Sequence, residues 1–301
     1  MRIFVTGATG YIGGAVARAL RRAGHDVSGL CRSEEKDREL GREEIRPVRG
    51  DMSQPQSYAE ALTECSVLVH CAVDYTSGTV APDRAVVDAF LAAAAKGARP
   101  KTLVYTSGVW VLGNTGDRAV DETAPLQPLA QVAWRPAHEQ LVLGASGARP
   151  LVIRPGCVYG GPGGLTGEWF AAARDKGAVT VIGDGTNHWA MVHVDDLADA
   201  YVRAVESGLS GEVFNVADRS RATVNEMAEA VARVAGCPGS VKHLSVIEAA
   251  KKLGPYAEWL AVDQHVDSRK AVRLLGWQPK HVGFVDEVGL FYEAWKAGPT
   301  T

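Results

Sequence analysis

Three glycines near the start of the chain have the spacing that a dinucleotide-binding turn needs. The segment TGATGYIGG at positions 6–14 contains Gly7, Gly10 and Gly13 in the pattern G-x-x-G-x-x-G. Gly7 permits a tight turn, Gly10 lets the backbone approach a pyrophosphate, and Gly13 lets a helix pack close to the preceding strand. Free N–H groups at the positive end of that helix would then bind the phosphates. A glycine-rich turn without a ligand is the simpler alternative, and the strand before and helix after the turn favour the dinucleotide site.

The elements that must position this turn alternate regularly along the first half of the chain. Residues 2–6 predict a strand, and residues 11–23 predict a helix with one apolar face that ends at Gly24. The same patterns predict strands at 27–31, 45–49, 67–71, 102–107 and 151–154, and helices at 54–63 after Ser53 as its cap, 82–95 and 135–145. Strands alternating with helices predict an α/β fold with a doubly wound, parallel Rossmann sheet that is covered on both faces.

After Pro155 this alternation becomes less regular. The stretch 156–168 contains six glycines and one proline, which predicts a loop. Shorter predicted strands and helices follow, with strands at 179–182, 189–193 and 213–216 and helices near 195–206, 223–235 and 284–296. We therefore expect a dinucleotide-binding domain over 1–155 and mostly a smaller substrate lobe over 156–301. Some strands between about 179 and 216 should return to the first sheet.

Composition argues against several classes of protein. The 301 residues include 32 Lys+Arg and 35 Asp+Glu, and no basic block suggests a nucleic-acid partner. No apolar run approaches the roughly 18 residues of a membrane span, and the N-terminus lacks a signal-peptide pattern. The five cysteines are scattered and form no metal-ligand spacing, which suggests free thiols and no metal site. We expect a cytoplasmic protein that binds small molecules.

The glycine spacing resembles that of the short-chain dehydrogenase/reductase superfamily, in its extended, epimerase-like branch. Other segments match the same family in order: HCA at 70–72, VYTSGVWVLG at 104–113, IRPGCVYG at 153–160, VHVDDLADA at 192–200 and LGWQP at 275–279. This resemblance covers nearly the whole chain and implies a nicotinamide cofactor. The cofactor contacts that it implies are Gly7, Thr9, Gly10, Tyr11, Ile12, Gly13, Asp51, Met52, Cys71, Ala72, Thr106, His138, Pro155, Gly156 and Val158.

The end of the second predicted strand bears on which nicotinamide is used. An NAD enzyme usually has Asp or Glu there to bind the ribose 2′-hydroxyl. This chain has Cys31, Arg32 and Ser33 instead. A guanidinium can bind a 2′-phosphate through two hydrogen bonds, and Ser33 can add a donor. We therefore predict NADPH, with NADH as the other possibility and an Arg32 that only faces water as the simpler alternative.

The chain differs from this family at the two residues that carry out the family's proton transfer. There, a Tyr donates a proton as hydride arrives, and a Lys four residues later lowers the phenol pKa and binds the ribose. In VAWRPAHEQ at 132–140 these positions hold Trp134 and His138. An indole N–H has no acid chemistry at neutral pH, so Trp134 cannot be the general acid. His138 could still bind the ribose, or it could be a helix residue satisfied by its neighbours.

A third family position, a Ser or Thr that binds the substrate oxygen, falls on Gly108 in this chain. Thr106 or Ser107 could take over this role because both end a strand beside the expected nicotinamide site. Backbone capping at the strand end is the alternative for both residues. Ser107 is the candidate catalytic residue.

Aromatic residues suggest the class of substrate. Six aromatic residues fall in segments that the family places around its substrate cleft: Trp110, Trp134, Trp169, Phe170, Trp189 and Tyr256. The four tryptophans are the candidate substrate-lining residues. Flat apolar walls suit a large planar ligand, although each tryptophan alone is more simply explained by packing. The chain also resembles ketoreductases that tailor bacterial aromatic polyketides, including angucyclinone antibiotics.

These features together predict an NADPH-dependent ketoreductase that acts on a bulky aromatic ketone. The proton would come from a substrate hydroxyl, from water or from Ser107. A generic aldehyde or alcohol dehydrogenase is one alternative, and an NADP(H)-binding sensor or scaffold without catalysis is the other. The resemblance leaves open whether the chain forms an oligomer, as many members of the family do.

Overall fold

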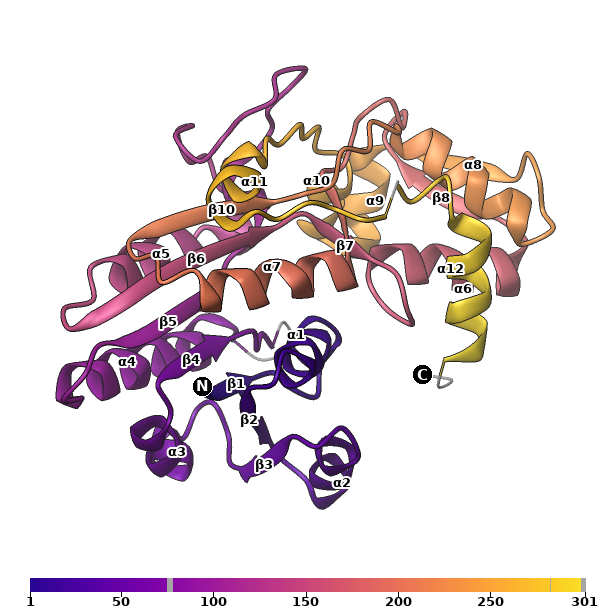
Figure 1. Cartoon of the computed structure of the whole chain (residues 1–301). Coiled ribbons are helices and arrows are strands. Elements are labelled where there is room, and N and C mark those ends of the chain that lie inside the picture. The colour runs from indigo at the N-terminus through magenta and orange to yellow at the C-terminus, as the bar shows by residue number, and fades with distance from the viewer. Residues whose placement is uncertain (75–77, 282, 299–301) are drawn as a thin grey trace.

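A central parallel sheet organises the protein (Figure 1). The computed structural model describes residues 1–74, 78–281 and 283–298. The sheet has seven strands in the order β10-β6-β5-β4-β1-β2-β3, and all of its neighbouring strands pair in parallel. Its strands are β1 (Arg2–Thr6), β2 (Asp26–Cys31), β3 (Arg46–Arg49), β4 (Val67–His70), β5 (Lys101–Thr106), β6 (Ala148–Pro155) and β10 (Glu212–Val216). The strand order reverses between β1 and β4, which confirms the predicted doubly wound α/β fold.

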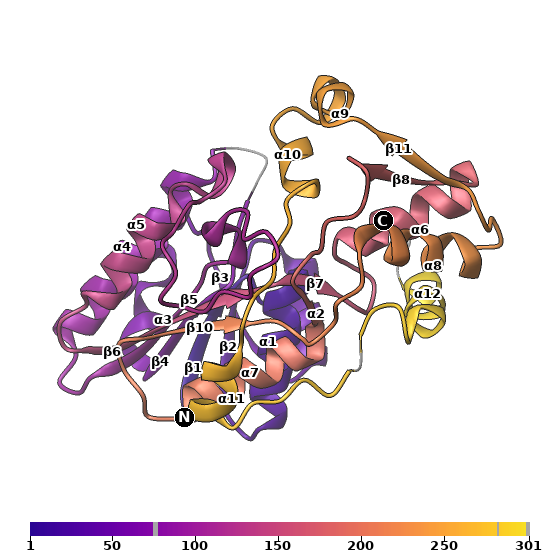
Figure 2. The same cartoon turned by 90° about the horizontal axis from the view of Figure 1, so that it is seen from above.

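Helices cover both faces of this sheet (Figure 2). Because side chains alternate along a strand, Ile3 and Val5 of β1 join one core and Phe4 joins the other. The first core packs against α1 (Tyr11–Arg22), α2 (Glu34–Arg42), α7 (Val194–Glu206) and α11 (Arg269–Leu275). The second packs against α3 (Ala59–Glu64), α4 (Val80–Lys96) and α5 (Arg135–Leu143).

The C-terminal part of the chain adds a smaller lobe, at the upper right of Figure 1. Two short sheets pair β7 (Cys157–Tyr159) with β9 (Met191–His193) and β8 (Val179–Ile182) with β11 (Val241–Leu244). The helices of the lobe are α6 (Leu165–Lys176), α8 (Val224–Val234), α9 (Val246–Leu253), α10 (Tyr256–Leu260) and α12 (Val288–Ala297). Of the strands predicted within 179–216, β10 joins the large sheet, whereas β8 and β9 pair within the small sheets.

Local structure differs from the predictions where the sequence signal is weak. Helix α2 was not expected because it is highly charged and buries only Leu40. The helix expected over 54–63 begins instead as a 3₁₀ turn, Pro55–Tyr58, before α3. Ser53 does not cap it, since its hydroxyl donates to Asp51. Among the described residues, no helix combines the length and the apolar character that a membrane span requires.

Candidate active site

The glycine turn after β1 has the geometry of a phosphate cradle. Gly7 adopts a φ of +74°, and a Cβ there would lie 2.8 Å from the backbone nitrogen of Ala72. The Gly10 N–H donates to the Gly7 carbonyl at 2.8 Å, which closes the turn. A Cβ on Gly13 would lie only 2.2 Å from the same carbonyl oxygen. Helix α1 therefore begins in direct contact with the turn, as the glycine spacing requires.

The first turn of α1 is suited to an anion. Its N-cap residue, Gly10, is exposed, and neither a capping side chain nor an acidic residue occupies the described first turn. Amide N–H groups without intrahelical partners point out of such a helix end, where the helix dipole is positive. Thr9, Tyr11 and Ile12 flank this end and are partly exposed. These residues fit the pyrophosphate of a dinucleotide.

Residues predicted for the adenosine end lie after β2 and β3. The Arg32 side chain is exposed, and among the described residues its guanidinium has no hydrogen-bond or ion-pair partner. Hydrogen bonds from Ser53, together with the charge of Arg32, hold the pKa of Asp51 below its usual value. Ser33 accepts a hydrogen bond from the Lys36 backbone and caps α2, while the Lys36 ammonium pairs with Glu39 at 2.8 Å. Met52 packs against the second sheet core. Arg32 is thus the available cation at this end.

A cavity of about 660 Å³ lies between the carboxyl ends of the sheet strands and the C-terminal lobe. This is where doubly wound folds bind their ligands. The cavity brings together ten of the predicted site residues, which come from α1, from the ends of β4, β5 and β6 and from β7: Tyr11, Ile12, Cys71, Ala72, Thr106, Ser107, Trp110, Pro155, Gly156 and Val158.

The Ser107 side chain lines this cavity. It is 5% exposed, and its Oγ has no hydrogen-bond partner among the described residues. Its backbone is bonded separately: the N–H donates to the Ile153 carbonyl at 2.8 Å, and its carbonyl accepts from Arg135 Nη1 at 2.5 Å. The hydroxyl is therefore not needed to cap the strand. A buried polar atom without a partner is costly, which suggests that a ligand satisfies it.

Two tyrosines close to the cavity, Tyr11 and Tyr201, are poorly suited to donate a proton. Burial raises the pKa of Tyr11, with a further contribution from Asp195, and its hydroxyl donates to the Gly160 carbonyl at 2.6 Å. Burial also raises the pKa of Tyr201 well above its usual value. The Tyr201 hydroxyl lies 2.6 Å from Thr106 Oγ1, so the Thr106 hydroxyl is already engaged.

Helix α5 carries a buried network in place of a Tyr/Lys pair. His138 Nδ1 lies 2.6 Å from one carboxylate oxygen of Asp83, and His70 Nε2 lies 3.2 Å from the other. Tyr105 donates a further hydrogen bond to Asp83 at 3.1 Å. Burial acts to raise the pKa of Asp83, but the His70 charge and the bonds from His138 and His70 outweigh it, so this pKa lies well below its usual range.

Four residues that were predicted for the nicotinamide and substrate end of the site lie outside the lining of this cavity. His138 is 4% exposed and bound to Asp83, which favours the alternative that its neighbours satisfy it. Trp134 donates its indole N–H to the Gln131 carbonyl at 3.0 Å and packs against the second sheet core. Trp169 and Trp189 stack with ring centroids 5.1 Å apart inside the core of the C-terminal lobe. For these two tryptophans, packing is the physical explanation.

Four other cavity residues, Arg135, Trp259, Gln131 and Glu168, were not expected from the sequence. Arg135 is buried against the strand end, with Nη1 bonded to the carbonyls of Thr106 and Ser107. Trp259 of α10 forms an aromatic wall with Trp110, at a centroid distance of 4.6 Å, and with Tyr256 at 5.5 Å. Gln131 and Glu168 also line the cavity. The placement of Arg135 one residue after Trp134, at the start of α5, was the one local signal that could have identified it.

Comparisons with known proteins agree with this geometry. The model of the "NAD dependent epimerase/dehydratase family" matches residues 3–217. A 3-diazoavenalumate denitrifying reductase from a Streptomyces species is 30% identical over 96% of this chain and 99% of its own length. A 4-hydroxy-2-methyl-3-oxo-4-farnesyl-3,4-dihydroquinoline-1-oxide ketoreductase from Stigmatella aurantiaca is 30% identical over 92% of this chain and 87% of its own.

A double mutant of a dTDP-glucose 4,6-dehydratase from Streptomyces venezuelae, solved with NAD and DAU bound, has the same fold. Its TM-score is 0.83 at 20% identity, and the match covers 98% of this chain and 97% of that one.

Proposed function

The chain belongs to the NAD-dependent epimerase/dehydratase family, and we propose that it is an NADPH-dependent ketoreductase acting on a bulky aromatic ketone. It is an NAD(P)-dependent enzyme, as the family is, and the proposal concerns its reaction and substrate. The observation that carries the proposal is the buried Ser107 hydroxyl, which has no partner among the described residues and lies at the edge of the cavity at the carboxyl ends of the sheet strands.

The cavity wall supports a planar, apolar substrate. Trp110, Trp259 and Tyr256 form one continuous aromatic surface. Among the described residues that line the cavity, Arg135 and Glu168 carry charge, and Arg135 is bonded to the backbone. A sugar nucleotide would need basic groups for its diphosphate, whereas an aryl ketone needs stacking surface and one or two donors. Two relatives at 30% identity are named as reductases, one of them as a dihydroquinoline oxide ketoreductase. An angucyclinone-type polyketide is the specific substrate that we propose.

The residues present would orient the ketone and stabilise charge on its oxygen. A bound reduced nicotinamide supplies the hydride. Ser107 would donate a hydrogen bond to the substrate oxygen, and Arg135 holds the Ser107 backbone in place while adding positive charge nearby. Orientation of this kind can supply effective molarities of about 10⁵ M or more, whereas a general acid contributes about 10²–10⁴-fold. The missing Tyr is therefore tolerable if a phenol on the substrate, a water or Ser107 provides the proton.

We expect Arg32→Ala to weaken binding of NADPH about 10–100-fold while changing binding of NADH less than threefold. The reason is the loss of charge-assisted hydrogen bonds to the 2′-phosphate, each worth about 1.5–3 kcal/mol. Isothermal titration of both cofactors measures this difference. Lys36→Ala is the matched control because Glu39 already pairs with Lys36, so its effect should be small. Equal losses for the two cofactors in Arg32→Ala would rule out a 2′-phosphate contact.

We expect Ser107→Ala to lower kcat/KM about 10²-fold with little change in cofactor affinity, because it removes a hydrogen bond to the developing alkoxide. Trp134→Phe is the control at the position of the family's Tyr. Its indole N–H donates to the Gln131 carbonyl and not to the cavity, and a phenyl ring keeps the aromatic face over Arg135, so activity should stay within about threefold. Steady-state kinetics on one aryl ketone tests both variants. A small effect of Ser107→Ala would assign the hydrogen bond to water or to the substrate itself.

The proposed reaction is tested by following NADPH absorbance at 340 nm with a panel of aryl ketones, half of which have a phenol beside the carbonyl. We expect oxidation of NADPH, and faster turnover of the ketones with the neighbouring phenol. A sensor would bind NADPH and never oxidise it. A generic dehydrogenase would turn over small aldehydes or alcohols as well as the aryl ketones.

A further inference from the structure

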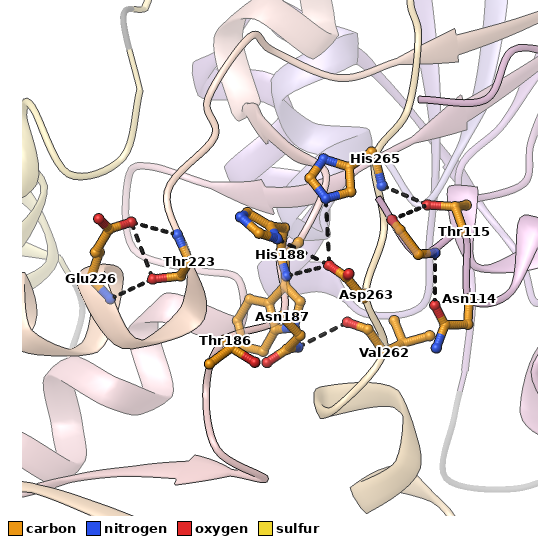
Figure 3. A network of polar contacts seen from close by, with 12 residues as sticks. Asn114, Thr115, Thr186, Asn187, His188, Thr223, Glu226, Val262, Asp263 and His265 are labelled. Atoms are coloured by element: carbon orange, nitrogen blue, oxygen red, sulfur yellow. Dashed lines mark hydrogen bonds and ion pairs between the residues drawn. The ribbon is translucent and has the colours of Figure 1, made fainter. Parts of the chain in front are cut away.

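A cluster of two histidines and an aspartate lies apart from the cavity lining described above (Figure 3). His188 precedes β9, while Asp263 and His265 follow α10. One imidazole nitrogen of each histidine points toward the same carboxylate, and the three side chains are partly exposed. We propose that His188, Asp263 and His265 bind a divalent transition-metal ion of the Zn²⁺ class.

The spacing of the ligand atoms matches such an ion. His188 Nδ1 lies 3.1 Å from Asp263 Oδ1, and His265 Nε2 lies 3.6 Å from the same oxygen. Zinc bonds to nitrogen and oxygen at about 2.0–2.2 Å in tetrahedral sites, which places two ligand atoms roughly 3.3 Å apart. The observed separations lie on either side of this value. Two imidazoles and one carboxylate are also a ligand set that Zn²⁺, Co²⁺ and Ni²⁺ accept.

Surrounding backbone groups hold the ligands in this arrangement. The His188 N–H donates to Asp263 Oδ1 at 2.7 Å and fixes the carboxylate. The Asp263 carbonyl accepts from the Thr115 N–H at 2.9 Å, and the His265 N–H donates to Thr115 Oγ1 at 2.8 Å. Figure 3 shows Thr115 on the side of Asp263 and His265 away from His188. Outer contacts of this kind orient metal ligands and raise affinity, so the site needs little rearrangement to bind.

A second cavity leaves room for a further ligand. It has a volume of about 530 Å³, and both His188 and His265 line it. Basic and acidic residues are equal in number in its lining, which contains three arginines (Arg219, Arg221 and Arg269) and three aspartates (Asp117, Asp218 and Asp267). A cation at the cluster therefore meets no excess of positive charge from this lining. A water molecule or another small ligand would complete four-coordination from the cavity side.

Metal binding would stabilise the segment that forms the aromatic wall of the substrate cavity. Asp263 and His265 follow the segment that carries Tyr256 and Trp259. The Asn187 amide and the Trp189 indole already hold that segment by donating to the carbonyls of Val262 and Leu260, and backbone bonds at His188 add to this. A bond from the ion to His188 would add a further cross-link between the segment and the residues just before β9. The consequence is a stability increase that does not depend on cofactor.

Titration of the full chain with CoCl₂ and ZnCl₂, after treatment with a chelator, tests the site. We expect one Co²⁺ per chain with visible d–d absorption, displacement by Zn²⁺, and a rise in Tm of about 5 °C at saturating metal. His265→Ala and Asp263→Asn should each weaken Zn²⁺ binding at least about 100-fold while the metal-free Tm stays within a few degrees.

Two controls separate this site from other histidines. His243→Ala removes an imidazole bonded to Asn225 and should leave metal binding unchanged. His281→Ala tests a second cluster, His193, Asp195 and His281, in which His193 Nδ1 already accepts a hydrogen bond from the Asp195 backbone. Retention of the one-to-one Co²⁺ signal in His265→Ala, its loss in His281→Ala, or no Co²⁺ signal in the wild-type chain would each overturn the proposal.

Discussion

Gly13→Ala is expected to weaken NADPH binding at least about 100-fold. A Cβ at this position would lie 2.2 Å from the Gly7 carbonyl oxygen and 2.6 Å from its carbon, and these are backbone atoms that cannot rotate away. Helix α1 would have to move off the turn by about an ångström, and misplacement of that size can cost 10²-fold in function. The overpacking should also lower the free energy of unfolding by about 1–3 kcal/mol. Cofactor titration followed by fluorescence, with circular dichroism to confirm folding, measures both effects.

The neighbouring glycine provides a matched control. A Cβ on Gly14 would meet the Ala8 carbonyl oxygen at 3.3 Å and a terminal nitrogen of Arg18 at 3.4 Å, contacts that small shifts relieve. Alanine also favours helix over glycine by up to about 1 kcal/mol. Gly14→Ala should therefore bind NADPH nearly as the wild-type chain does. Similar losses in the two variants would show that helix packing in general, and not the contact with the turn, determines affinity.

The parts of the fold that could be predicted are those in which burial is periodic. Strands β1 and β4 are apolar runs, and α1 has an apolar face with Gly24 after its end. Helix α2 gave no such signal because it lies at the surface and buries a single leucine. The small sheets of the C-terminal lobe have strands of three or four residues whose partners are distant in sequence. Pairing of such short strands depends on tertiary contacts that no local pattern encodes.

The candidate site divides in the same way. The glycine turn and the strand ends could be located because glycine spacing predicts the turn and apolar runs predict the strands. The tryptophans could not be assigned, since an indole packs equally well in a core or on a cavity wall. Trp169 and Trp189 lie in a core, while Trp259 lines the cavity from a five-residue helix that periodicity cannot reveal. Likewise, His138 meets its partner Asp83 across 55 residues, so its environment became visible only in the folded chain.

Asp83→Asn, which removes the charge from the contact between Asp83 and His138, should lower the free energy of unfolding at pH 7 by about 3–5 kcal/mol. The carboxylate is buried between the imidazoles of His70 and His138, and an amide in its place loses the charge that strengthens these buried hydrogen bonds. Because the pKa of Asp83 is lowered in the folded chain, its contribution to stability is present above about pH 4 and is lost as the pH falls below that. The difference between the wild-type chain and Asp83→Asn should therefore shrink in acid.

Denaturant unfolding of both proteins between pH 3 and pH 8 measures this difference. Asp88→Asn is the control on the same helix, because Asp88 is exposed and forms only a surface pair with Arg84. That variant should change stability by less than about 0.5 kcal/mol. A loss below about 1 kcal/mol for Asp83→Asn, or a loss that does not vary with pH, would mean that neutral hydrogen bonds and not charge hold this network together. Helix α5, which carries Arg135 to the strand end beside Ser107, would then depend on apolar packing for its position.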